Sequence, residues 1–208
     1  MRIACALVAI LLLGPWSGQR LDDPSPRSQG ATSGLGTRLL GPLASVAASV
    51  EWVRFDRAVE AKNFTQAYAI ANRALALDPA SPHGWDLYAG HLIFYRGGAL
   101  LEADPERRVD WIRAGLDLLA EGAAKSRAPA TLHLIRGQIL AFYVADVASD
   151  PEALPWPGGS GAASHAGIVA MEKAMELGHP KAHERKHQAV QAAIARGQRQ
   201  PPSSSRSR

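Results

Sequence analysis

The stretch FTQAYAIANRALALDP, residues 64–79, is the part of the sequence that says most about the fold. Its apolar and small residues recur every three or four positions, so that they share one side of a helix: Phe64, Ala67, Ala71, Ala74 and Leu75. Asn63 separates the stretch from the preceding segment, and Asp78-Pro79 ends it because proline cannot continue a helix. We therefore predict an α-helix from about Phe64 to Leu77, with small residues on its packing face.

The segments around this helix share its periodicity, and none alternates apolar and polar residues as a strand would. A helix beginning near Pro42 is expected to bury one apolar stripe, formed by Leu43, Val46, Val50 and Val53 and widened by Ala47, Trp52, Phe55 and Val59. Further helices are expected within residues 81–97, 104–128, 132–147, 165–178 and 180–196. The chain is rich in alanine and only 6% aromatic, so we predict an all-α fold in which short connections make neighbouring helices antiparallel.

Two local signals set boundaries within this pattern. Asp104-Pro105-Glu106 combines a capping carboxylate, a proline of the first turn and a second acid near the positive end of the helix dipole. Residues 149–162 are rich in proline and glycine, and we expect them to form an irregular loop. In the last helix, the predicted packing stripe is formed by His183, His187, Val190 and Ile194.

The segment from Trp52 to Trp85 resembles a tetratricopeptide repeat (TPR) followed by the start of the next repeat. The small residues at positions 67, 71 and 74 match the tight packing of that family's second helix on its first, and Leu75 and Pro79 match the repeat's end. Trp85 follows Trp52 by 33 residues, close to the family's period of about 34. Lys62 stands where the family usually has glycine, and the later pairs, 104–148 and 165–196, lack the consensus residues.

This resemblance implies antiparallel helix pairs stacked as a short TPR-like right-handed solenoid. One helix pair cannot bury its apolar face alone, whereas stacked pairs bury a continuous core. Such a stack curves and leaves a concave groove, in which side chains are free to hold an extended peptide or a partner helix. The resemblance therefore implies a binding module, but it does not identify a ligand.

The predicted helices place one TPR-like domain at residues 42–197. Met1-Arg2 precedes eleven uncharged residues, Ile3 to Leu13, which is typical of a secretory signal. We interpret residues 1–18 as a signal peptide or as an N-terminal membrane anchor attached through residues 3–18; the alternative is a buried N-terminal helix. Residues 19–41 are predicted to be a flexible linker, and residues 198–208 a disordered basic tail.

Export follows from this interpretation of the N-terminus. The domain is then periplasmic or membrane-anchored outside the cytoplasm, in the cell envelope of a bacterium whose alanine-, glycine-, arginine- and proline-rich composition indicates a GC-rich genome. The single cysteine, Cys5, excludes an intramolecular disulfide and a structural zinc site built from several cysteines.

The predicted third helix carries the candidate partner-binding groove. Tyr88, His91 and Tyr95 recur at i, i+3 and i+7, so they share a face, and Arg96 lies beside them. If that face lines a groove, these residues contact a protein or peptide partner; the alternative is that they pack between helices. Trp156, in the predicted irregular loop, is placed at one edge of the groove, where it pins the loop onto the helices.

One motif favours a different function. His183-Glu184-Arg185-Lys186-His187 fits H-E-x-x-H, in which two histidines bind zinc and the glutamate acts as general base. Arg185 and Lys186 are charged where zinc-protease helices are usually uncharged, and no His, Asp or Glu follows His187. We therefore keep a metal-dependent hydrolase using His183, Glu184 and His187 as the alternative, and expect these histidines to pack on the preceding helix.

The leading hypothesis from the sequence is a non-catalytic protein–protein interaction adaptor or scaffold of the cell envelope. Under this hypothesis we expect no cofactor and no metal. We also expect no nucleic acid as a partner, because the basic tail lacks interleaved aromatic residues. No phosphate-binding G-x-x-x-x-G-K-[ST] motif is present. A third hypothesis is a structural assembly protein whose groove is filled by its own loop or by a second copy.

Overall fold

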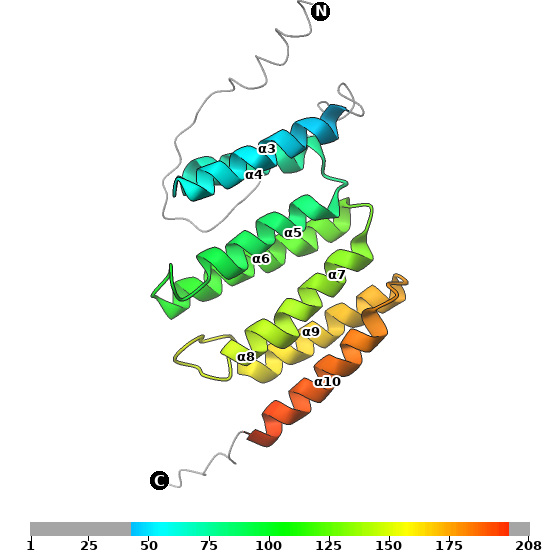
Figure 1. Ribbon diagram of the computed structural model, residues 1–208. Helices are drawn as coiled ribbons and strands as arrows, with labels where there is room; N and C mark the ends of the chain where they lie inside the picture. Colours follow the sequence, from blue (N-terminus) through cyan, green and yellow to red (C-terminus); the bar gives the residue numbers. More distant parts are fainter. Residues whose placement is uncertain (1–42, 200–208) are drawn as a thin grey trace, which may run out of the picture.

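The computed structural model describes residues 43–199 (Figure 1). The predicted signal peptide or anchor, 1–18, and the predicted linker, 19–41, lie outside this range. The predicted tail, 198–208, also lies outside it except for its first two residues, which belong to the last helix.

The prediction of an all-α fold is confirmed for the described residues, which contain no strand. Two of the helices continue through a π-helical segment, η1 or η2, in which the turns are wider. The elements are α3 (Leu43–Glu60), α4 (Phe64–Leu77), α5 (Pro82–Gly90) with η1 (His91–Arg96), α6 (Pro105–Lys125), α7 (Pro129–Gln138) with η2 (Ile139–Val144) and α8 (Ala145–Val147), α9 (Gly159–Glu176) and α10 (Ala182–Arg199).

The helices lie side by side in chain order. α3 packs on α4, the continuous rod α5–η1 packs on α6, and the rod α7–η2–α8 packs on α9. Figure 1 shows these pairs following one another from the blue to the orange end, with α10 against α9 as the last helix. Each element therefore contacts mainly its neighbours in the sequence.

The helix starts follow local chemistry. The Asn63 side chain accepts a hydrogen bond from the Gln66 backbone N–H at 3.2 Å, and the Asp104 carboxylate accepts one from the Glu106 backbone N–H at 3.0 Å. Each bond satisfies a donor that the first turn of a helix leaves without a partner. The start that Asp104-Pro105-Glu106 predicts is thus confirmed.

The predicted packing face of α4 is confirmed. Ala67, Ala71 and Ala74 are each 1% exposed or less, and they let α3 and α4 lie close together. Leu75 is buried on the same face, and Phe55 of α3 is 2% exposed. Phe55, Ala67, Ala71 and Leu75 thus belong to one hydrophobic core.

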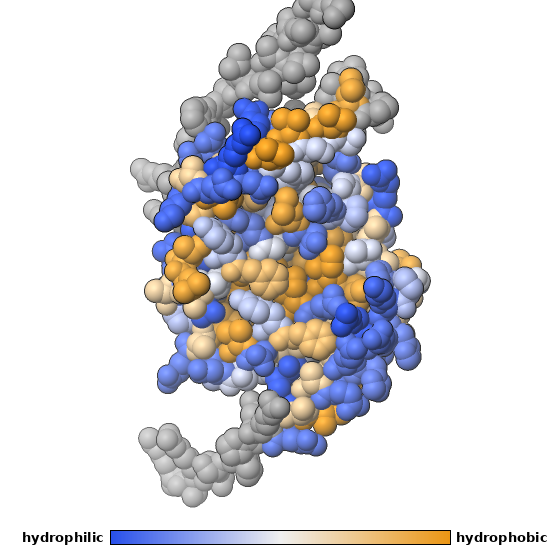
Figure 2. Space-filling model, viewed as in Figure 1, coloured by the Kyte–Doolittle hydropathy of each residue, from blue (hydrophilic) through white to orange (hydrophobic). Residues whose placement is uncertain are grey.

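The central stripe predicted for the packing face of α3 is wrong. Leu43, Val46, Val50 and Val53 are 53% exposed or more, and apolar side chains appear on the outer side of α3 (Figure 2). The buried face is formed by Ala44, Ala48, Glu51, Phe55 and Ala58. Of the residues expected to widen the stripe, Phe55 is buried, and Trp52 and Val59 pack against the core. α3 is apolar on two sides, and alanines at the contact allow α4 to approach more closely than branched valines would.

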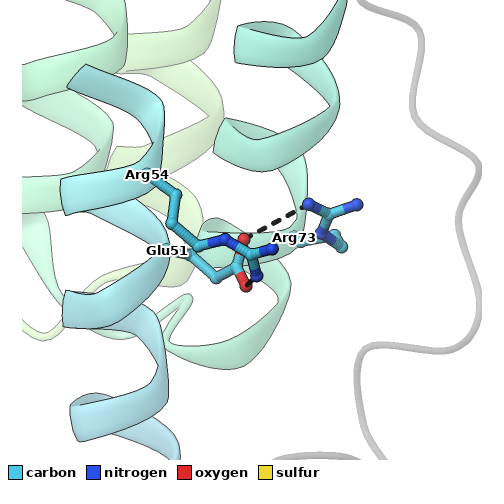
Figure 3. A network of polar contacts seen from close by, with 3 residues as sticks. All are labelled: Glu51, Arg54 and Arg73. Atoms are coloured by element: carbon cyan, nitrogen blue, oxygen red, sulfur yellow. Dashed lines mark hydrogen bonds and ion pairs between the residues drawn. The ribbon is translucent and has the colours of Figure 1, made fainter. Parts of the chain in front are cut away.

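Glu51 lies on the buried face of α3 because two arginines neutralise it. Its carboxylate accepts hydrogen bonds from Arg54, one turn along α3, at 2.9 Å and from Arg73 of α4 at 3.3 Å (Figure 3). The Glu51 side chain is 5% exposed, whereas both arginines remain about half exposed. A carboxylate is tolerated at such a position only when it is paired, and this one also joins two helices.

The start of α9 corrects the predicted loop. Residues 149–162 were expected to be irregular, but α9 already begins at Gly159. Gly158 precedes it with a φ of 75°, and the Ser160 hydroxyl donates a 2.6 Å hydrogen bond to the Ala145 carbonyl. Gly159 also has a positive φ, 66°, so these two glycines form the left-handed turn into α9, and the Ser160 bond fixes the first turn of α9 on α8.

The stripe predicted for the last helix is also wrong. His183 and His187 are exposed, and Ile194 is 50% exposed. Ala182 and Ala189 are fully buried instead. α10 therefore approaches α9 through small residues, as α3 approaches α4, while the longer Lys186 and Arg196 side chains reach Glu172 and Ser164 of α9.

The two π-helical segments lie at corresponding places in successive helix pairs. Both contain Leu-x-Phe-Tyr: residues 92–95 in η1 and residues 140–143 in η2. The rings of Phe94 and Tyr143 meet edge to face, with centroids 4.9 Å apart. π-Helical turns are uncommon and occur often at functional sites, so η1 and η2 are natural places to look for one.

Candidate functional site

Aromatic side chains from three helices gather around η1. We call this group the η1 cluster; it consists of Phe64 and Tyr68 from α4, His91, Tyr95 and Arg96 from η1, and Trp111 from α6. The His91 and Tyr95 rings stack 5.1 Å apart, and the Tyr68 ring lies 6.0 Å from that of His91 and 6.1 Å from that of Trp111. Residues far apart in the sequence thus form one compact group.

Arg96 brings a positive charge into this group. Its guanidinium carbon lies 4.6 Å from the ring centre of Phe64 and 4.7 Å from that of Trp111. Contacts of this kind attract a cation to the negative faces of the rings. Within residues 43–199, the ion pairs all use other cations, and no carboxylate or carbonyl accepts a hydrogen bond from Arg96.

Three polar atoms of the η1 cluster are buried without a hydrogen-bond partner: Tyr68 Oη, His91 Nε2 and Arg96 Nε. A buried polar group that loses its partner costs about 1–3 kcal/mol. Such atoms are uncommon in folded proteins, and three of them lie within this one cluster. This is the feature that distinguishes the η1 cluster from an ordinary apolar core.

Of the titratable side chains in the η1 cluster, Arg96 is the one that carries a charge at neutral pH. Burial raises the pKa of Tyr68 to about 12, and the nearby Arg96 charge opposes this only in part. Burial, and then the same arginine charge, lower the pKa of His91 to about 4. At neutral pH the phenol and the imidazole are therefore both uncharged, and the site carries one positive charge.

Arg108 holds the end of η1 in place. It is 8% exposed, and it donates from Nε to the Gly97 carbonyl at 3.1 Å and from Nη1 to the Ala153 carbonyl at 2.7 Å. These bonds tie the residue after Arg96 to α6 and to the connection before α9. Arg108 is thus a positioning residue for the η1 cluster.

The outer edge of the η1 cluster is apolar. Phe94 is 51% exposed and Tyr95 is 38% exposed, and the following loop exposes Leu100 and Leu101. Single exposed apolar residues are common, whereas four of them occur here within residues 94–101. We call Phe94, Tyr95, Leu100 and Leu101 the η1 edge.

The structure separates the residues predicted to line a groove. Tyr88 is 1% exposed and packs against Phe55 at 6.2 Å, so the packing alternative holds for it. His91 is partly buried, and Tyr95 reaches the surface. Trp156 packs on the core from the connection between α8 and α9, with Arg113 5.7 Å from its ring centre. Trp156 pins the connection, as expected, but it is not a member of the η1 cluster.

The sequence interpretation missed Phe64, Tyr68, Phe94 and Trp111. Phe64, Tyr68 and Trp111 come from other helices, so spacing within one helix cannot reveal them, and Phe94 lies outside the i, i+3, i+7 set on the same rod. The available signal was the recurrence of Leu-x-Phe-Tyr in η1 and η2.

The histidines of the H-E-x-x-H motif lie elsewhere, on the exposed side of α10. His179 lies four residues before His183 and is the nearest upstream histidine that could add a ligand; its ring accepts a hydrogen bond from the Lys181 backbone N–H at 3.2 Å. Among residues 43–199, no group of three or more His, Cys, Asp or Glu side chains is placed to hold a metal ion.

Comparisons of the chain with protein-family models, with curated proteins and with solved structures give no match. Within the part of the chain that the structure describes, no helix combines the length and the apolar character needed to cross a membrane.

His91 is expected to make stability depend on pH. The unfolded chain protonates this histidine near its ordinary pKa of 6.5, whereas the folded chain keeps it neutral down to about pH 4. Its contribution is therefore complete above pH 6.5 and declines as the pH falls toward 4. The full shift corresponds to roughly 3 kcal/mol, and partial exposure of the ring reduces the expected loss to about 1.5 kcal/mol.

Urea unfolding at about pH 7 and about pH 4.5 measures this loss. Other groups titrate in the same range, so His91→Gln serves as the comparison and should lack the His91 component. An identical pH dependence in the two proteins would contradict the assignment.

Proposed function

We propose that the chain is a non-catalytic adaptor or scaffold that binds a protein or peptide partner, and that its helix pairs form a short TPR-like right-handed solenoid. Pairs that follow one another in chain order and contact mainly their neighbours support this arrangement. Lys62, at the position where the TPR family usually has glycine, has a φ of 56°, in the left-handed region that favours glycine.

The observation that carries the proposal is the η1 edge, with Arg96 behind it. Exposed aromatic side chains and arginine contribute most to binding at protein interfaces, because they bury large areas at a low cost in conformational entropy. Phe94 and Tyr95 are held by a π-helical segment, by stacking of Tyr95 on His91, and by contact of Phe94 with Tyr143. The edge is therefore fixed before a partner arrives, which favours binding.

We further propose that the adaptor acts in the cell envelope, either exported to the periplasm or anchored outside the cytoplasm through residues 3–18. This part of the proposal rests on the uncharged run after Met1-Arg2. It is tested by fractionating cells that express the full chain and probing protease access to the domain; full protection in the cytosolic fraction would contradict it.

Affinity capture of the tagged full chain from its own cells tests the binding site. Phe94→Ser removes an exposed ring of the η1 edge, and Val50→Ser removes an apolar side chain of nearly equal exposure, 54% against 51%, from α3. The proposal predicts that Phe94→Ser reduces retention of the partner about tenfold or more and that Val50→Ser retains it.

The other outcomes have clear meanings. Loss with Val50→Ser alone would place the interaction on α3, and equal retention by both variants would remove the η1 edge from the interface. Self-association instead of a separate partner would appear as concentration-dependent sedimentation of the purified chain, and it would favour the assembly hypothesis.

A further inference from the structure

We infer that the η1 cluster binds a carboxylate group of the partner polypeptide, with Arg96 as the cationic contact. This inference rests on the proposed function and adds the chemistry that the partner presents. The carboxylate belongs either to an aspartate or glutamate side chain or to the end of a chain; both present the same group.

The first support is the donor set. Arg96 has no acceptor within the described residues, and its Nε is buried. Tyr68 Oη and His91 Nε2, also buried and unpartnered, belong to the same group of rings. A guanidinium offers N–H groups in a fixed plane, the phenol offers an O–H, and the neutral imidazole offers an N–H in one of its tautomers. Such a set favours an oxygen acceptor with a negative charge.

The second support is that the arginine is already fixed. Its contacts with the rings of Phe64 and Trp111 limit the orientations of the guanidinium, and Arg108 holds the adjoining Gly97. Arginine paired with a carboxylate often forms two parallel hydrogen bonds, for which a preset plane lowers the entropic cost. The nearest acid along the chain, Glu102, is engaged by Arg107 at 3.4 Å.

The charge of the site selects among ligands. A cation is disfavoured because Arg96 already occupies the faces of the aromatic rings. With Tyr68 and His91 neutral, the site offers one positive charge, which matches a single carboxylate better than a phosphate dianion. The apolar η1 edge beside Arg96 suits a polypeptide whose acidic group lies next to an apolar residue.

Titration of the full chain with a matched pair of small ligands tests the inference. N-acetylphenylalanine carries a carboxylate beside an aromatic ring, and N-acetylphenylalaninamide differs from it only in that group. Binding is followed by NMR at the Arg96 Nε–H and the Trp111 indole N–H. A ligand of about 15 heavy atoms is expected to bind with a dissociation constant on the order of 1 mM, and the amide at least tenfold more weakly.

Further ligands separate the sources of the group. N-acetylglutamate 1-amide carries only a side-chain carboxylate, so its affinity relative to that of N-acetylphenylalanine distinguishes a side chain from a chain end; binding of either supports the inference. Inorganic phosphate is the competing anion. Binding of phosphate but of neither carboxylate, or equal binding of acid and amide, would overturn the inference.

Variants locate the contact. Arg96→Met should weaken N-acetylphenylalanine binding tenfold or more, and Arg96→Lys should weaken it less, because lysine keeps the charge but not the planar donors. Arg113→Met is the matched control, since it removes an arginine from the ring face of Trp156, and it should bind normally. Unchanged affinity in Arg96→Met would overturn the inference. The comparison of acid with amide on the wild-type chain remains decisive if Arg96→Met fails to fold.

This test and the test of the proposed function fail separately. If neither carboxylate binds but Phe94→Ser still abolishes partner capture, the carboxylate inference falls and the adaptor stands. If carboxylates bind at Arg96 but capture does not depend on the η1 edge, the carboxylate site is real and the placement of the partner on the η1 edge falls.

Discussion

Trp85→Ala is expected to destabilise the protein by about 4 kcal/mol, the largest effect of a single substitution that we predict. The Trp85 side chain is 3% exposed, and its indole N–H donates a 2.9 Å hydrogen bond to the Pro79 carbonyl. Gly122 of α6 lies directly against it, so closely that a Cβ at that glycine would fall 2.5 Å from the indole. Removing the ring therefore opens a cavity between α5 and α6.

Urea unfolding of wild type, Trp85→Ala and Trp85→Phe measures the effect. Trp85→Phe keeps an aromatic ring but loses the hydrogen bond and part of the volume, and about 1–2 kcal/mol is expected for it. Trp156→Ala, in the connection between α8 and α9, is the control tryptophan and should cost less than Trp85→Ala. A loss below about 1 kcal/mol for Trp85→Ala would contradict the placement of this ring in the core.

Gly167→Ala is expected to destabilise the protein by about 2 kcal/mol, although alanine is the better helix former. A Cβ at Gly167 would lie 2.7 Å from the Ala141 backbone nitrogen and 2.8 Å from the Gly137 carbonyl oxygen. A Cβ at Gly137 would in turn meet the Gly167 carbonyl oxygen at 2.8 Å. The two helices therefore meet backbone to backbone, and a methyl group forces them apart.

Gly161→Ala in the same helix is the matched control. Nothing lies within 4 Å of a Cβ at this position, so the ordinary preference of a helix for alanine should appear as a gain of about 0.5 kcal/mol. Opposite signs for the two substitutions in thermal unfolding are the expected result. A gain at both positions would contradict the close backbone contact between these two helices.

Helix positions were predictable because the signals for them are local. Asn63 and Asp104 cap their helices with their own side chains, and proline opens α5, α6 and α7. These effects depend on residues within one turn, and the sequence alone shows them. The start of α9 at Gly159, within the predicted loop, is not visible in the local sequence, because it depends on the hydrogen bond from Ser160 to the distant Ala145 carbonyl.

Helix faces were less predictable, because the choice of face depends on the neighbour. On α3 the face containing Val46 and Val50 is exposed, and the face containing Ala48 is buried. On α10, likewise, His183 and His187 are exposed, and Ala182 and Ala189 are buried. Hydrophobicity predicts that a residue prefers burial, whereas close helix packing selects small residues, and here the second effect prevails.

The candidate site could be predicted in part. Spacing on one helix correctly grouped His91 with Tyr95 and placed Arg96 beside them. It also included Tyr88, which is buried in the core. Phe64, Tyr68 and Trp111 come from neighbouring helices, and only the packing of three helices brings them to Arg96. Unpartnered buried atoms, the feature that marks the site, have no counterpart in the sequence.

Site-specific photo-crosslinking tests the central claim, a partner surface at the η1 edge, most directly. Benzoylphenylalanine replaces Phe94 in the full chain in one experiment and Val50 in another, since both positions are about half exposed. The proposed function predicts a light-dependent adduct with one partner from position 94 in living cells, and none from position 50. An adduct from position 50 alone, or from neither position, would contradict it.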